Sequence, residues 1–161
     1  MNEKTAKNKI REHISKNSFF AGMKEDHLDF LAGTAHLIHG QTGEVLFRLG
    51  EPARCFYLAL SGEVTVEVPA IQGPGLQLQS LGSGKMIGWS WLIDPYRWDF
   101  QARVISEAEL IEFDGKAILA QCEKDNEFGY VLFKRFTNLM SERLTSARRR
   151  MMDQWDAPGF A

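Results

Sequence analysis

The sequence lacks most of the features that would assign it to a secreted, membrane or nucleic-acid-binding class. Its two cysteines, Cys55 and Cys122, lie far apart, without the spacing of a metal or redox motif. No apolar run approaches the roughly 18 residues that span a bilayer, and residues 1–17 lack the apolar core of a signal peptide. The net charge is −2, so no basic field attracts nucleic acid or membranes. We therefore expect a cytoplasmic protein with reduced thiols.

Signatures of catalysis and of metal binding are missing as well. His36 and His39 are three residues apart, which would place them on opposite faces of a strand. No pairing of serine or cysteine with histidine stands out, so we expect neither an enzyme nor a metal site. The length of 161 residues suits a single domain, 1–161, of ordinary globular composition.

The periodicity of the apolar residues divides this domain into three parts. Residues 1–33 predict two short helices, over 3–16 and about 24–32. Residues 34–114 contain short runs of alternating apolar residues separated by glycines, which predicts a mainly β sandwich or barrel. Residues 115–155 return to helical spacing, with a short helix over 115–124 and a long one over 126–155.

The long C-terminal helix carries an apolar stripe of about eight turns that includes Phe128 and Trp155. A helix of this length extends beyond a barrel of this size. Its distal part therefore needs another surface, either a twin helix in a homodimer or the barrel itself. The predicted dimer interface consists of Leu132, Phe136, Leu139, Met140, Leu144, Ala147 and Met151.

Residues 84–93 form the stretch around which the chain is organised. Gly84 and Gly88 follow a polar loop and precede what reads as one short helical turn. Backbone amides exposed at such a turn form a nest for an anion such as phosphate. Beyond Pro95, the run from Arg97 to Ile105 reads as a strand that would close over the nest.

Two segments, EVLFRLGE (44–51) and FYLALSGEVTV (56–66), resemble the first strands of a cyclic-nucleotide-binding domain. The resemblance covers residues 19–155 and points to the sensor domains of Crp/Fnr-type bacterial regulators, such as the catabolite activator protein. It implies a β-roll, a double-stranded β-helix of jelly-roll type, with flanking helices and a long dimerisation helix. The helix-turn-helix domain that follows this helix in those regulators has no counterpart here, so we expect no autonomous DNA binding.

The resemblance also implies a phosphate-binding cassette, and this sequence departs from it. The family pattern is Phe-Gly-Glu, a short helix and then Arg-Ser/Thr-Ala-x-Val. Its glutamate binds the ribose and its arginine pairs with the cyclic phosphate. Trp89 stands at the glutamate position and Phe100 at the arginine position. Two lost charge-assisted hydrogen bonds weaken binding by roughly 10²–10⁴, so we expect weak cAMP binding or none.

The predicted ligand site consists of Ile87, Gly88, Trp89, Ser90, Trp91, Arg97, Phe100, Gln101 and Ala102. Three interpretations stay open. The aromatic residues between 89 and 100 form a pocket for a flat or apolar ligand, or Arg97 supplies the phosphate contact, or the cassette has collapsed and the domain is a ligand-free dimerisation scaffold.

The function expected is a non-catalytic ligand-sensing or interaction module that does not bind cAMP in the usual way. No cofactor is specified. The candidate ligands are a cyclic nucleotide or another small anionic or aromatic molecule. The expected partner is a second copy of the chain, with another protein as an alternative and no membrane.

Overall fold

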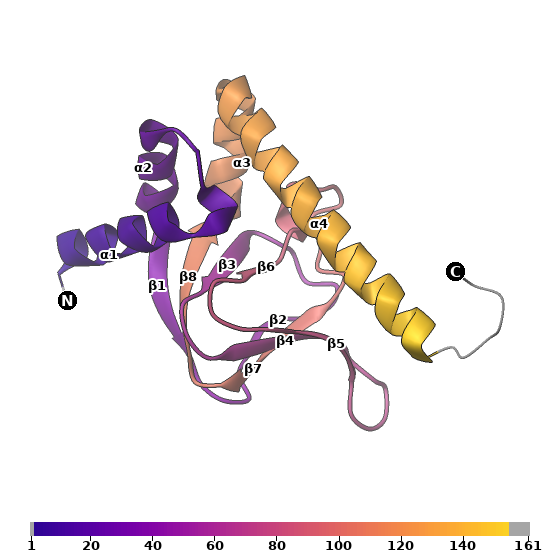
Figure 1. The fold of residues 1–161 in the computed structure, drawn as a ribbon. Helices are drawn as coiled ribbons and strands as arrows, with labels where there is room; N and C mark the ends of the chain where they lie inside the picture. The colour runs from indigo at the N-terminus through magenta and orange to yellow at the C-terminus, as the bar shows by residue number, and fades with distance from the viewer. Residues whose placement is uncertain (1, 155–161) are drawn as a thin grey trace.

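Eight antiparallel strands build two four-stranded sheets in the computed structural model, which describes residues 2–154 (Figure 1). The strands are β1 (Ala35–Gly40), β2 (Val45–Phe47), β3 (Cys55–Ala59), β4 (Glu63–Val68), β5 (Leu76–Leu81), β6 (Met86–Ile87), β7 (Gln101–Ser106) and β8 (Ala108–Asp114). One sheet has the order β1-β8-β3-β6 and the other the order β2-β7-β4-β5. The expected β-roll with a long C-terminal helix is confirmed.

The turn between β3 and β4 needs glycine at position 62. Its φ is +77°, and a Cβ atom there would lie 2.3 Å from the carbonyl oxygen of Glu107. The amides of Leu60 and Ser61 both donate to the carbonyl of Glu109. These bonds hold the turn against the start of β8, where the chain passes from one sheet to the other.

The N-terminal helices match their predicted positions. Helix α1 (Glu3–Lys16) buries Ile10 and Ile14, the two apolar residues that marked its inner face. A single 3-10 turn, η1 (Ser18–Phe20), leads into α2 (Glu25–Gly33).

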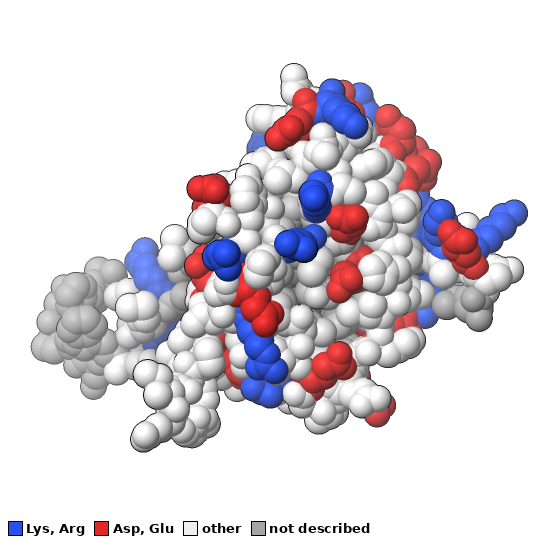
Figure 2. All heavy atoms as spheres, turned by 180° about the vertical axis from the view of Figure 1, so that it is seen from behind, with Lys and Arg blue, Asp and Glu red and all other residues white. Residues whose placement is uncertain are grey.

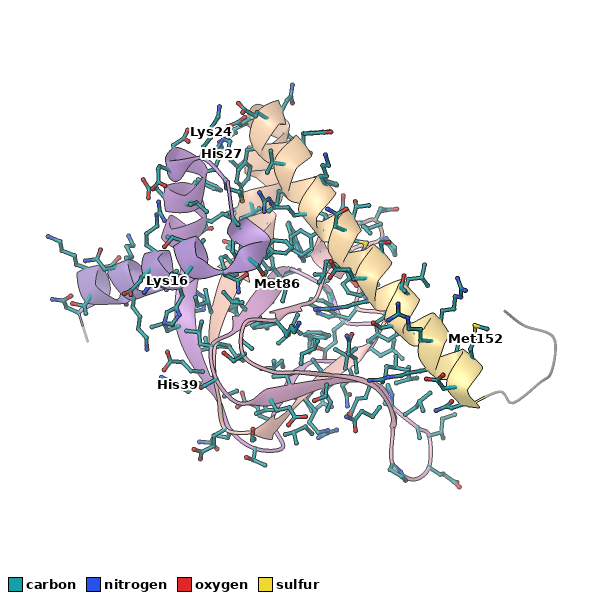
Figure 3. The ribbon with its side chains drawn as sticks, in the orientation of Figure 1. Lys16, Lys24, His27, His39, Met86 and Met152 are labelled. Carbon is teal, nitrogen blue, oxygen red and sulfur yellow. The ribbon has the colours of Figure 1, made fainter. Side chains whose placement is uncertain are left out.

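Asp125 connects three helices at the other end of the chain. It lies between α3 (Gly115–Lys124) and α4 (Asn126–Gln154). One oxygen of its carboxylate accepts the amide of Phe128 at 3.1 Å, which caps the start of α4. The other oxygen lies 3.0 Å from Nε2 of His27, in α2 (Figure 3). The first turn of α4 is thereby fixed to the N-terminal helices.

An aromatic cluster joins the first half of α4 to the β1-β8-β3-β6 sheet and to a short 3-10 turn, η2 (Ser90–Leu92). Phe136 of α4 packs edge-on against Phe56 of β3 and Trp91 of η2, with ring centroids 5.2 and 5.3 Å apart. Phe56 also stacks on Phe113 of β8 at 4.5 Å. All four side chains are buried, so this half of α4 belongs to the core of the chain itself.

Two residues assigned to the dimer interface are therefore corrected. Leu132 and Phe136 are fully buried, because this face of the first half of α4 packs against the sheet, so neither side chain is available to a partner. The stripe was also predicted to include Trp155, which lies outside the described residues.

The second half of α4 extends past the core, as Figure 1 shows. Leu139 and Met140 are half-buried at the edge of the core. Leu144 and Met151 are 73% and 65% exposed, and Ala147 is exposed as well.

The segment before β7 is a loop, in contrast to the strand predicted to begin at Arg97. Strand β7 begins only at Gln101, because the preceding residues pair with the loop after β2. The amide of Trp98 donates to the carbonyl of Glu51, and the amide of Gly50 donates to the carbonyl of Trp98.

Figure 2 shows the face opposite to that of Figure 1, where acidic and basic side chains are intermixed. This agrees with a net charge near zero, at −2. No helix within residues 2–154 is both long enough and apolar enough to cross a membrane.

The close approach at the β3–β4 turn can be tested with two glycine variants. Gly62→Ala is expected to reduce the free energy of unfolding by about 2–5 kcal/mol, because it combines a strained φ with a clash against backbone. Gly43→Ala is the matched control, since Gly43 also has a positive φ, +88°, but a Cβ atom there would have no neighbour within 4 Å. It should cost only about 1–2 kcal/mol. Equal losses in urea titrations would contradict the close approach.

Candidate functional site

The short turn predicted after Gly88 is present as η2. Gly88 has a φ of +91°, and a Cβ atom there would lie 2.8 Å from two ring carbons of Trp98. Glycine thus allows the indole of Trp98 to pack directly on the backbone of the turn. Because η2 has only three residues, it provides little helix dipole, and the charge for binding an anion must come from elsewhere.

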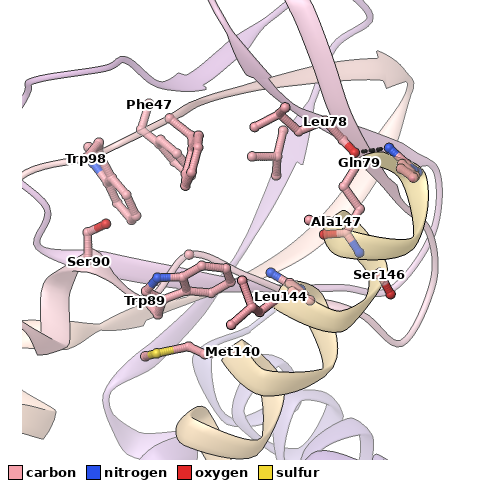
Figure 4. Close-up of a pocket in the computed structure, with 15 residues that line it drawn as sticks. Phe47, Leu78, Gln79, Trp89, Ser90, Trp98, Met140, Leu144, Ser146 and Ala147 are labelled. Atoms are coloured by element: carbon pink, nitrogen blue, oxygen red, sulfur yellow. Dashed lines mark hydrogen bonds between the residues drawn. The ribbon is translucent and has the colours of Figure 1, made fainter. Parts of the chain in front are cut away.

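A cavity of about 370 Å³ lies between this turn, the strands of the roll and the second half of α4 (Figure 4). The volume is within the range of small-molecule sites. The turn contributes Gly88, Trp89 and Ser90, and α4 contributes Met140, Arg143, Leu144, Ser146, Ala147 and Arg150.

Aromatic and aliphatic side chains form the walls of this cavity. Phe47 of β2 stacks on Trp98, with ring centroids 3.7 Å apart and planes inclined by 13°. In Figure 4 these two rings lie on one side of the cavity, and Trp89 lies on the other side with Met140 and Leu144. The space between them suits a flat, apolar molecule.

Arg143 brings a positive charge to the same cavity. Its guanidinium donates a hydrogen bond to the carbonyl of Met86 and lies 5.2 Å from the centre of the Trp89 ring, within cation–π range. Burial lowers the pKa of Arg143 to about 10, because desolvation disfavours the charged form. The side chain nevertheless stays protonated at neutral pH.

Four of the nine residues predicted for the ligand site line the cavity, and they are Gly88, Trp89, Ser90 and Phe100. Three others belong to the core, where they support the site from behind, and they are Ile87, Trp91 and Ala102. The predicted aromatic group is therefore divided between packing and the cavity wall.

The two remaining predicted residues form hydrogen bonds outside the cavity. The amide of Gln101 donates to the carboxylate of Glu67 at 2.6 Å. Arg97 is exposed, and its Nη1 donates to the carbonyl of Gly50 at 2.8 Å. Neither side chain lines the cavity.

The contribution of α4 to the site was not predicted from the sequence. Arg143 follows Phe136 by seven residues and precedes Ala147 by four, so it lies on the inward-facing stripe of the helix. Cations at Arg143 and Arg150, seven residues apart on an otherwise apolar stripe, were the signal that could have indicated it.

The site offers binding groups but little for catalysis. Among the described residues that line the cavity there is no carboxylate or histidine. Burial raises the pKa of Cys55 and of Cys122 to about 11, so both thiols are protonated and weakly nucleophilic at neutral pH. Within residues 2–154, no three His, Cys, Asp or Glu side chains are placed to hold a metal ion.

Residues 37–125 match the family model of the cyclic nucleotide-binding domain. This match covers more than half of the chain and includes the turn at Gly88 and the strands on both sides of it. None of the curated protein sequences compared with the chain matches it.

Solved structures share the fold over most of the chain. A cyclic nucleotide-binding domain from Methylobacillus flagellatus has a TM-score of 0.76 at 17% identity, covering 96% of this chain and 86% of its own. The sensor domain of the regulator DNR from Pseudomonas aeruginosa has a TM-score of 0.70 at 19% identity, covering 96% and 98%.

A third similar structure is the catabolite activator protein of Thermus thermophilus. It has a TM-score of 0.65 at 22% identity and covers 83% of this chain and 61% of its own. The family model, the order of strands and the long terminal helix all agree, and the chain belongs to the cyclic nucleotide-binding domain family.

Proposed function

We propose that this chain is a non-catalytic ligand-sensing module of the cyclic-nucleotide-binding type that does not bind cAMP in the usual way. The observation that carries the proposal is that the turn at Gly88 and helix α4 together form the wall of the cavity. One side is the turn at Gly88–Ser90, and the other is α4 from Met140 to Arg150. A ligand in this space contacts both, so its binding affects the helix that extends beyond the core.

The cavity wall disfavours a cyclic nucleotide. Trp89 and Phe100, which replace the two charged residues of the family pattern, both face the cavity. Arg97 was the alternative source of charge, but it is exposed and bonded to the carbonyl of Gly50. Each missing charge-assisted hydrogen bond costs about 1.5–3 kcal/mol of binding free energy.

The division of the aromatic residues favours a ligand site over a collapsed scaffold. Trp91 packs in the core against Phe56 and Phe136. Trp89 and Phe100, in contrast, remain partly exposed and face open space. A cassette collapsed onto its own tryptophans would bury these rings against one another and leave no cavity.

We also propose that the partner is a second copy of the chain, joined along a surface of α4 that we call the outer seam. Its residues recur alternately at three and four positions, the spacing of a coiled coil. They are Tyr130, Phe133, Thr137, Met140, Leu144, Ala147 and Met151. All except Met140 are exposed. In an isolated chain they would form a largely apolar surface without a partner.

A calorimetric titration tests the nucleotide part of the proposal. Wild-type protein is expected to show no cAMP or cGMP binding in the micromolar range, because the cassette lacks both charged contacts. The double variant Trp89→Glu with Phe100→Arg restores them and is expected to gain affinity. Micromolar cAMP binding by the wild type would contradict the proposal.

A small molecule retained through purification distinguishes a sensor from a scaffold. Denaturing extraction of the wild type followed by mass spectrometry is expected to release such a molecule in near-stoichiometric amount. Val66→Phe, which places a larger side chain at the cavity wall, should retain much less while keeping the same circular dichroism spectrum. Identical extracts from the two proteins would favour the scaffold.

The outer seam is tested by Leu144→Glu. Burying one leucine contributes about 1.5–3 kcal/mol, so two lost leucines and two like charges should weaken the dimer at least about 100-fold. Light scattering should show a folded monomer. Thr145→Glu is the control, since Thr145 is exposed but off the seam, and it should remain dimeric. A Leu144→Glu variant that stays dimeric would move the interface elsewhere, and one that unfolds would place this half of α4 in the core.

A further inference from the structure

We propose that the ligand of the cavity is a flat, largely apolar molecule with one anionic group, and that Arg143 of α4 binds this group. The inference rests on the proposed function, because it names the class of ligand for the same cavity. It places the charge for ligand recognition on the helix, whereas the family pattern places it in the cassette.

The Arg143 guanidinium is incompletely paired, which favours an anionic partner. The group carries five N–H donors, and within residues 2–154 it bonds to the carbonyl of Met86 and lies over the Trp89 ring. No described carboxylate lies within salt-bridge distance of it. Arg103, by comparison, lies 3.1 Å from the carboxylate of Glu67. Arg143 is partly buried, and the Glu142 carboxylate that acts on its charge is exposed and does not line the cavity. Removing a cation from water is costly, and an anionic ligand in the cavity offsets that cost.

The aromatic surroundings of Arg143 favour a planar ligand. The stacked rings of Phe47 and Trp98 face Trp89 across the cavity. Such walls suit a molecule with a planar ring system, because ring faces and edges pack well on one another. The volume of about 370 Å³ holds a molecule of a few rings and excludes a polymer.

The number of cations in the cavity wall that are shielded from water indicates the number of anionic groups on the ligand. Arg150 also lines the cavity, but it is exposed and donates to the carbonyl of Leu78. A charge in contact with water contributes little to binding. The described cavity wall therefore contains one partly buried cation, Arg143, and is matched by one anionic group on the ligand.

Two fluorescent probes with similar ring systems test this inference on the full chain. The probe 1-anilinonaphthalene-8-sulfonate carries a sulfonate, and N-phenyl-1-naphthylamine has the same rings without it. Both are titrated into the wild type, Arg143→Gln, Arg143→Lys and Arg148→Gln. The last of these removes an exposed arginine of the same helix that does not line the cavity. Circular dichroism confirms that each variant is folded.

We expect Arg143→Gln to lose at least about tenfold in affinity for the sulfonate probe, the size of one charge-assisted hydrogen bond. Its affinity for the neutral probe should stay within about twofold of wild type. Arg143→Lys should keep most of the sulfonate affinity, and Arg148→Gln should match the wild type for both probes.

Unchanged sulfonate affinity in Arg143→Gln, or an equal loss for both probes, would overturn the inference. The proposed function would still stand in that case, provided that the neutral probe binds. Failure of both probes to bind the wild type would overturn the inference and the proposed function together. If Arg143→Gln does not fold, the affinities of the wild type for the two probes are compared instead. Tighter binding of the sulfonate probe, although it is the more water-soluble of the two, supports the inference. Tighter binding of the neutral probe overturns it.

Discussion

The edge-on packing of Phe136 against Phe56 and Trp91 is the contact on which the rest of the structure depends. These three rings come from α4, from β3 and from the turn η2, which are distant in the sequence. Replacing a buried phenylalanine by alanine typically costs about 3–5 kcal/mol. One contact of this size fixes the helix and the turn relative to the same sheet, and thereby fixes the two walls of the cavity relative to each other.

The cavity lies where this packing ends. From Leu132 to Phe136 the buried side chains of α4 are large and apolar, and they fill the space against the sheet. From Arg143 onward the inward stripe carries an arginine and the small residue Ala147, which leave space in front of Trp89 and Trp98. The position of the site therefore follows from the order of side-chain sizes along one helix.

The sequence was sufficient for the type and approximate limits of most elements. Turn glycines such as Gly62 and the return of helical spacing after residue 114 are strong local signals. Periodicity could not show which part of the apolar stripe of α4 is buried and which part is exposed, because Phe136 and Leu144 have the same apolar character. Only the position of the sheet determines which of the two is buried.

The candidate site was also only partly predictable, because local sequence does not show tertiary contacts. The Gly88 turn was found because its backbone conformation is encoded locally. The strand expected from Arg97 was a loop, because its residues pair with a loop some fifty residues earlier. Arg143 was missed because its spacing shows only that it lies on the inward-facing stripe, whereas its contact with Trp89 arises through tertiary packing.

Leu144 and Ala147 line the cavity, and both are also exposed on α4. In the proposed dimer the helix of the second copy covers this edge of the cavity, so a bound molecule leaves mainly while the two copies are apart. If both proposals hold, the residence time of the ligand would depend on the protein concentration. A dilute sample would release its ligand quickly and a concentrated one would retain it, although the contacts to the ligand are the same in both.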